Sequence, residues 1–131
     1  GDNKTPSGVF QFKTIFYRKD RISIIRSHLK KIVIRKKMGW CDDPTSKHYN
    51  KLIKFPFHFK AEKFWLKENI YDVIIIINYN MKPILKKKGS AIFIHIAKKN
   101  YSSTRGCVAI SKKDMNLLIS RISSKTKLKI H

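Results

Sequence analysis

The residues with the most evident chemistry are Cys107 and His95, twelve positions apart. Cys107 follows Gly106 at the end of a polar loop, and His95 lies in the apolar run 91–97. A thiolate is the reactive form of cysteine, and an imidazole from a neighbouring strand can take the thiol proton. Glycine lets a carbonyl approach the backbone, where the N–H groups of Gly106 and Cys107 could form an oxyanion hole. The pattern predicts a catalytic Cys107 with His95 as its base.

Both residues also have a structural interpretation. A lone cysteine is more often a small buried residue than a nucleophile, and His95 alone could be a hydrogen-bonded core histidine. The combination of Gly106, the polar loop before it and a histidine on an adjacent strand favours catalysis over packing.

The elements that must position these residues are mainly strands, with one or two helices. Strands are predicted at 8–18, 71–78 and 91–97, and one or two exposed strands within 21–37. A short helix is predicted at 59–68, a loop at 40–49, and a half-buried edge strand at 126–130. In the run 91–97, strand alternation puts Phe93, His95 and Ala97 on one face and three isoleucines on the other.

The cysteine loop is expected to lead into a helix. Ser111 to Asp114 resembles a capping box, with Asp in place of the usual Glu or Gln. Met115, Leu118, Ile119 and Ile122 follow at helical spacing and would pack on the sheet.

The net charge of +22 over 131 residues has two explanations. Attraction to an anionic polymer, such as a cell wall or a nucleic acid, is one. Compositional drift towards Lys, Ile and Asn, as from an AT-rich coding sequence, is the other, and we favour it as the main cause. Nucleic-acid readers usually concentrate charge on one face and add stacking aromatics, whereas the aromatics here alternate with apolar residues.

The remaining reactive side chains do not suggest a metal or cofactor site. The two cysteines and five histidines lack zinc-ligand spacing. Cys41 and Cys107 could form a disulfide in a secreted protein, but a nucleophilic Cys107 must be free. Cys41 would then be a structural residue or a neighbour of the site, and a small buried structural residue beside Trp40 is favoured. Asp42 and Asp43 could recognise an amine or form a turn before Pro44; the turn is favoured.

Several motifs, in order along the chain, resemble the L,D-transpeptidase catalytic domain family (YkuD-like). The segment 1–10, GDNKTPSGVF, is similar to the family's Gly-Asp-x-x-Thr-Pro-x-Gly-x-Phe, and His95 with Thr-Arg-Gly-Cys at 104–107 resembles its catalytic signature. The blocks 39–44, 49–50, 71–73, 79–80 and 89–95 are similar to an alphaproteobacterial-type subgroup. The matches extend to about residue 120.

The resemblance implies a β-sandwich-like or barrel-like catalytic domain over residues 1–131, with an N-terminus truncated relative to the family. It implies transfer of a peptidoglycan stem-peptide acyl group through a Cys107 thioester, with release of D-Ala. The acceptor would be an amine of a second stem peptide or of an outer-membrane protein, or water in a carboxypeptidase side reaction. The expected location is the periplasm or cell envelope, with a leader absent from this chain and no transmembrane segment.

The chain departs from the family at two positions near the cysteine. Arg105 stands where most members have His, and Ala109 replaces a polar residue. Arg105 could bind a substrate carboxylate or be a solvated loop cation, and Thr104 would orient the loop.

The central block supplies the other candidates for substrate binding. Trp40, Tyr49 and Asn50 could line the cleft, although Trp40 could equally be a core residue. Two further functions remain open: an inactive cell-wall-binding domain, and a basic nucleic-acid-binding protein in which the cysteine and histidine are incidental.

Overall fold

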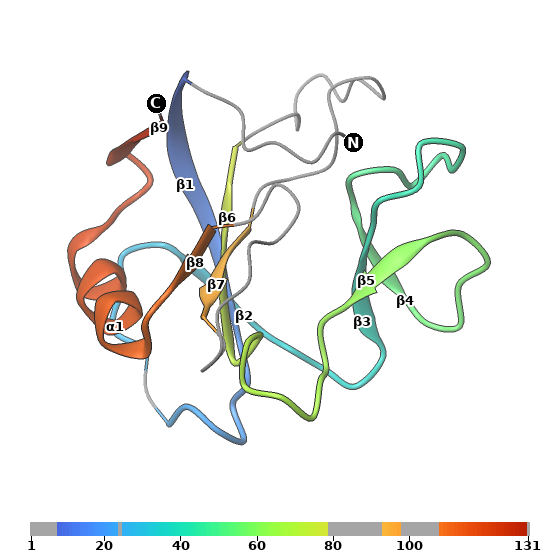
Figure 1. Cartoon of the computed structure of the whole chain (residues 1–131), viewed down its shortest axis with the longest axis horizontal. Coiled ribbons are helices and arrows are strands. Elements are labelled where there is room, and N and C mark those ends of the chain that lie inside the picture. Colours follow the sequence, from blue (N-terminus) through green and yellow to red (C-terminus); the bar gives the residue numbers. More distant parts are fainter. Residues whose placement is uncertain (1–7, 24, 79–92, 98–107, 131) are drawn as a thin grey trace.

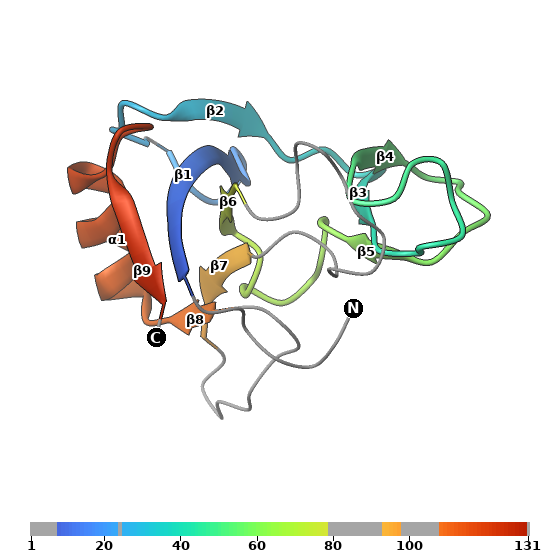
Figure 2. The same ribbon diagram turned by 90° about the horizontal axis from the view of Figure 1, so that it is seen from above.

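The computed structural model describes residues 8–23, 25–78, 93–97 and 108–130, which form three layers. A six-stranded sheet lies in the middle, with the helix α1 (Lys112–Arg121) on one side and a three-stranded sheet on the other (Figures 1 and 2). The helix of the described part is too short and too polar to cross a membrane. The prediction of a mainly β fold is confirmed.

The main sheet has the strand order β2-β1-β6-β7-β8, and β9 also pairs with β1. Its strands are β1 (Gly8–Tyr17), β2 (Lys30–Val33), β6 (Val73–Ile77), β7 (Phe93–Ile96), β8 (Val108–Ile110) and β9 (Lys127–Ile130). The long β1 holds β9 along its first half and β2 along its second half. The β7–β8 pairing is parallel, with His95 opposite Ala109.

The central strand β6 explains why the domain has two cores. Its sequence VIIII is buried at every position, as expected for a strand covered on both faces. Val73, Ile75 and Ile77 belong to a core under α1, together with Met115, Ile119 and Ile122 of the C-terminal segment. Ile74 and Ile76 belong to the second core, between the two sheets.

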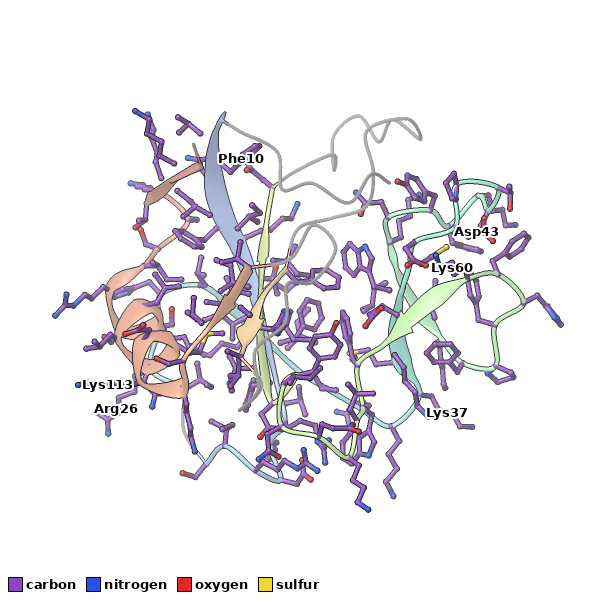
Figure 3. All side chains as sticks on the ribbon, in the orientation of Figure 1. Phe10, Arg26, Lys37, Asp43, Lys60 and Lys113 are labelled. Carbon is purple, nitrogen blue, oxygen red and sulfur yellow. The ribbon has the colours of Figure 1, made fainter. Side chains whose placement is uncertain are left out.

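The small sheet supplies the other wall of the second core. It consists of β3 (Met38–Cys41), β4 (Leu52–Lys54) and β5 (Ala61–Lys63) in the order β4-β3-β5. Side chains fill the space between the sheets (Figure 3). Phe64 is the centre of this packing, because its ring contacts the rings of Phe16, Tyr71 and Phe93.

Most predicted elements are confirmed, and a few are wrong. The strands near 8–18, 71–78, 91–97 and 126–130 and the helix after Ser111 are present. The helix predicted at 59–68 is instead β5 followed by irregular backbone, because pairing with β3 overrides the helical pattern. The start of the predicted 40–49 loop belongs to β3. The expectation of one or two exposed strands within 21–37 is confirmed by β2. The short β8 was not predicted.

Removal of the helix cap should destabilise the domain measurably. The Ser111 hydroxyl accepts a hydrogen bond from the Asp114 N–H at 3.1 Å, which satisfies one free donor of the first helical turn. We expect Ser111→Ala to lower the free energy of unfolding by about 1 kcal/mol, measured by urea denaturation. Ser124→Ala, the same change at an exposed position, should leave it unchanged.

The turn at the tip of the small sheet depends on an ionised Asp43. The Thr45 hydroxyl and N–H donate to its Oδ1 at 2.7 and 3.0 Å, and the Lys60 N–H donates to Oδ2 at 3.2 Å. Figure 3 shows Asp43 and Lys60 next to each other. The hydrogen bond from the Thr45 side chain is the main cause that lowers the pKa of Asp43 below its ordinary value. The predicted turn is confirmed.

This lowered pKa predicts a pH dependence of stability. The stabilisation is fully present above the unfolded-state pKa of about 3.9 and is lost as the pH falls through the lower folded-state pKa. Between about pH 5 and pH 2, the melting temperature of Asp43→Asn should therefore fall by less than that of the wild type. Glu68→Gln, at an exposed carboxylate, is the control and should titrate like the wild type.

Candidate active site

The candidate site is built on His95, in the middle of β7. His95 is 2% exposed and points to the inter-sheet side, with Phe93, whereas Ile94 and Ile96 point into the core under α1. The predicted alternation along this strand is confirmed. The histidine therefore lies on the face of the main sheet that the small sheet covers.

The hydrogen bond of the His95 ring defines its tautomer. Nδ1 lies 3.1 Å from the carbonyl oxygen of Ile96. A carbonyl oxygen only accepts, so Nδ1 carries the proton and donates it in this contact. The lone pair of the neutral imidazole is then on Nε2, which is the nitrogen able to accept a proton. The backbone thus fixes both the orientation and the basic atom of the ring.

Tyr71 packs beside the imidazole and is hydrogen-bonded to Glu62, and sequence reasoning did not identify either of them as a site residue. The Tyr71 ring meets the His95 ring edge-on, with centroids 5.4 Å apart, and its hydroxyl donates to Glu62 Oε1 at 2.7 Å. Glu62 is on β5, opposite Trp40 of β3. The small sheet therefore holds the tyrosine that packs against His95.

The three central candidates for substrate binding are buried. Trp40 donates its indole N–H to Asn50 Oδ1 at 3.0 Å, and its ring meets Phe93 edge-on at 5.8 Å. Asn50 has a φ of 60°, a backbone conformation that asparagine tolerates better than most residues. Tyr49 lies buried beside it. Trp40 belongs to the core between the two sheets, which is the alternative role considered for it from the sequence.

Cys41 and Asp42 adjoin this group on the small sheet. Cys41 is a free thiol with 0% exposure, as expected for a structural cysteine. Asp42 Oδ1 is buried and has no hydrogen-bond partner among the described residues, whereas Asp43 makes the turn described above.

The other predicted site residues, Thr104 to Cys107, lie outside the described residues. The strand β8 begins at the next residue, Val108, and pairs in parallel with β7 so that Val108 is opposite Ile94. The start of β8 therefore lies directly beside β7, the strand that carries His95.

His95 is thus a buried histidine on a strand, with Nδ1 held by a backbone carbonyl. The model of the L,D-transpeptidase catalytic domain (YkuD) matches residues 1–130, and the chain belongs to this family. No curated protein and no solved structure matches the chain significantly.

The family supports an L,D-transpeptidase-type function with peptidoglycan as the substrate. The prediction of this family from the sequence motifs is thereby confirmed.

Proposed function

We propose that the chain is a peptidoglycan L,D-transpeptidase in which Cys107 is the nucleophile and His95 the general base. The observation that carries this proposal is the hydrogen bond from His95 Nδ1 to the Ile96 carbonyl, because it leaves Nε2 as the proton acceptor. Membership of the family supplies the reaction class.

The pairing of β7 and β8 supports the assignment of Cys107. Val108 and Ile110 pack with the core under α1, so alternate residues of β8 belong to the opposite face. Ala109, opposite His95, therefore belongs to the face that holds His95, and Cys107 is two residues before Ala109 in the sequence. A thiol on that face could give its proton to Nε2.

The proposed reaction has two acyl transfers. His95 Nε2 takes the thiol proton, and the Cys107 thiolate attacks the carbonyl carbon between meso-diaminopimelate and the terminal D-Ala. The N–H groups of Gly106 and Cys107 would stabilise the oxyanion. The C–N bond then breaks, the departing D-Ala amine takes the proton from His95, and a thioester remains.

In the second transfer, an acceptor amine attacks the thioester and its proton passes to His95. The C–S bond breaks, the product leaves with a new amide bond, and His95 returns the proton to the thiolate. Water as the acceptor would give L,D-carboxypeptidase activity instead. A second stem peptide is the acceptor that we propose, with an outer-membrane protein as the alternative.

We assign the remaining candidates to the binding of the stem peptide. Arg105 would bind a substrate carboxylate, since a planar guanidinium can make two parallel hydrogen bonds to it, and Thr104 would orient the loop. The buried residues Trp40, Tyr49 and Asn50 would support the site from inside the protein, on the side of Phe93 and His95 away from the peptide. The proposed location is the periplasm or cell envelope, and the proposed subgroup is the alphaproteobacterial type.

The proposal is tested with a synthetic tetrapeptide stem ending in D-Ala and a diaminopimelate-containing acceptor. Mass spectrometry should detect a cross-linked product and free D-Ala, and neither should form with Cys107→Ala. Folded protein that binds the stem without releasing D-Ala would instead identify an inactive wall-binding domain. Equal D-Ala release by Cys107→Ala would reject the assigned nucleophile.

A further inference from the structure

A pocket of about 510 Å³ lies where the ends of β1 and β2 meet, away from the candidate active site. Its lining includes Trp65, Ile34, Lys19, Asp20, Arg35 and Lys36. In the main sheet, β2 and β7, the strand of His95, are separated by β1 and β6, which corresponds to roughly 14 Å at a strand spacing of ~4.8 Å. The pocket is therefore a separate surface from the one that carries His95.

The carboxylate that lines the pocket, Asp20, forms an ion pair with the buried Arg18. Arg18, 3% exposed, donates to Asp20 through Nε at 2.8 Å and through Nη2 at 2.7 Å. Lys19, Arg35 and Lys36 line the same pocket, and their side chains make no ion pair with any carboxylate of the described residues. The pocket thus has three uncompensated positive charges.

The aromatic part of the pocket is held rigidly. The Arg18 guanidinium lies 3.4 Å above the centre of the Trp65 ring, and its Nη1 also donates to the Leu66 carbonyl at 2.9 Å. Because Arg18 covers one face of the indole, the part of the ring that lines the pocket is the other face or the edge. A fixed positive charge behind the ring also makes it a poor site for a cationic ligand.

We propose that this pocket binds an acidic saccharide, with the sugar ring against the half-buried Trp65 and the carboxylate beside the exposed Arg35 and Lys36. A pyranose has an apolar C–H face that packs on an indole, and a guanidinium makes paired hydrogen bonds to a carboxylate. The volume is within the range of small-molecule sites. A simple inorganic anion would use the cations but not the apolar wall.

The site can be tested with the full chain and a matched pair of sugars, at an ionic strength of about 0.15 M to suppress binding through general charge. Digalacturonate is the acidic probe, and its dimethyl ester has the same rings without the charges. The chain has two tryptophans, so an NMR titration reports two indole N–H signals. Digalacturonate should shift the Trp65 signal saturably, and the Trp40 signal, whose N–H is bonded to Asn50, should stay in place.

Two variants, each of which removes one positive charge, distinguish binding in the pocket from binding to the rest of the basic surface. Arg35→Gln should weaken digalacturonate binding about tenfold, as for loss of one charge-assisted hydrogen bond. Lys54→Gln, at an exposed cation of β4 in the small sheet, should change it less than twofold. Melting temperatures of both variants confirm that the fold is intact.

Three results would overturn the proposal. Equal affinity for the dimethyl ester would show that the cations are not used, and equal affinity for diglutamate would show that the sugar ring is not recognised. Equal weakening by Arg35→Gln and Lys54→Gln would show that only net charge matters. Because none of these measurements involves acyl transfer, they are independent of the function proposed for Cys107 and His95.

Discussion

The rate of D-Ala release should fall by about 10²–10⁴-fold in His95→Ala, the usual contribution of a general base. In the proposed mechanism Nδ1 is held by the Ile96 carbonyl and Nε2 takes the thiol proton, so removal of the ring would remove the base. Steady-state assays on the stem peptide measure the rate, and circular dichroism checks the fold.

His95→Asn separates catalysis from packing at this buried position. The asparagine amide can still donate to the Ile96 carbonyl, in place of Nδ1–H, but it cannot accept the thiol proton. We expect the same loss of rate with a smaller loss of stability than in His95→Ala. His28→Ala, at an exposed histidine, is the control for losing an imidazole as such. Near wild-type turnover in folded His95→Asn would exclude His95 as the base.

The largest loss of stability is expected from Phe64→Ala, about 3–5 kcal/mol. Phe64 has 0% exposure and its ring meets three others, at 5.4 Å for Phe16, 5.6 Å for Phe93 and 6.1 Å for Tyr71. Truncation therefore leaves a cavity between the two sheets. Since small domains have about 5–15 kcal/mol in total, the variant should be close to unfolding, as measured by urea denaturation.

Phe59→Ala is the matched control for this cavity. Phe59 is 43% exposed and its ring contacts only Phe57 among the described aromatic rings, at 5.8 Å. The same truncation should cost less than about 1 kcal/mol there, as is usual at the surface. If the two variants lost equal stability, the packing between the sheets would not be what holds them together.

Regular alternation made part of the site predictable from the sequence. The run 91–97 alternates cleanly, so the face of His95 followed from the positions of Phe93, Ile94 and Ile96. The strand β6 and the helix after Ser111 were also predicted from the sequence, because an apolar run and a capped amphipathic segment are strong local signals.

Tyr71 could not be placed in the same way. It is two residues before Val73, so strand alternation would assign both to the core under α1. The chain turns before β6 begins, and Tyr71 instead faces the other core and His95. The short β8 and β5 have three residues each, below the length at which a periodic pattern is recognisable. Long-range pairing, rather than local sequence, decides such elements.

Cys107 is proposed to be an activated, acyl-accepting thiol. Intact-mass spectrometry after incubation with a carbapenem tests it most directly, since the resemblance to L,D-transpeptidases implies acylation of the cysteine. We expect one stable adduct on the wild type and on Cys41→Ala, which removes the buried thiol, and none on Cys107→Ala. No adduct on folded, reduced protein, or an adduct that persists in Cys107→Ala, would contradict the account.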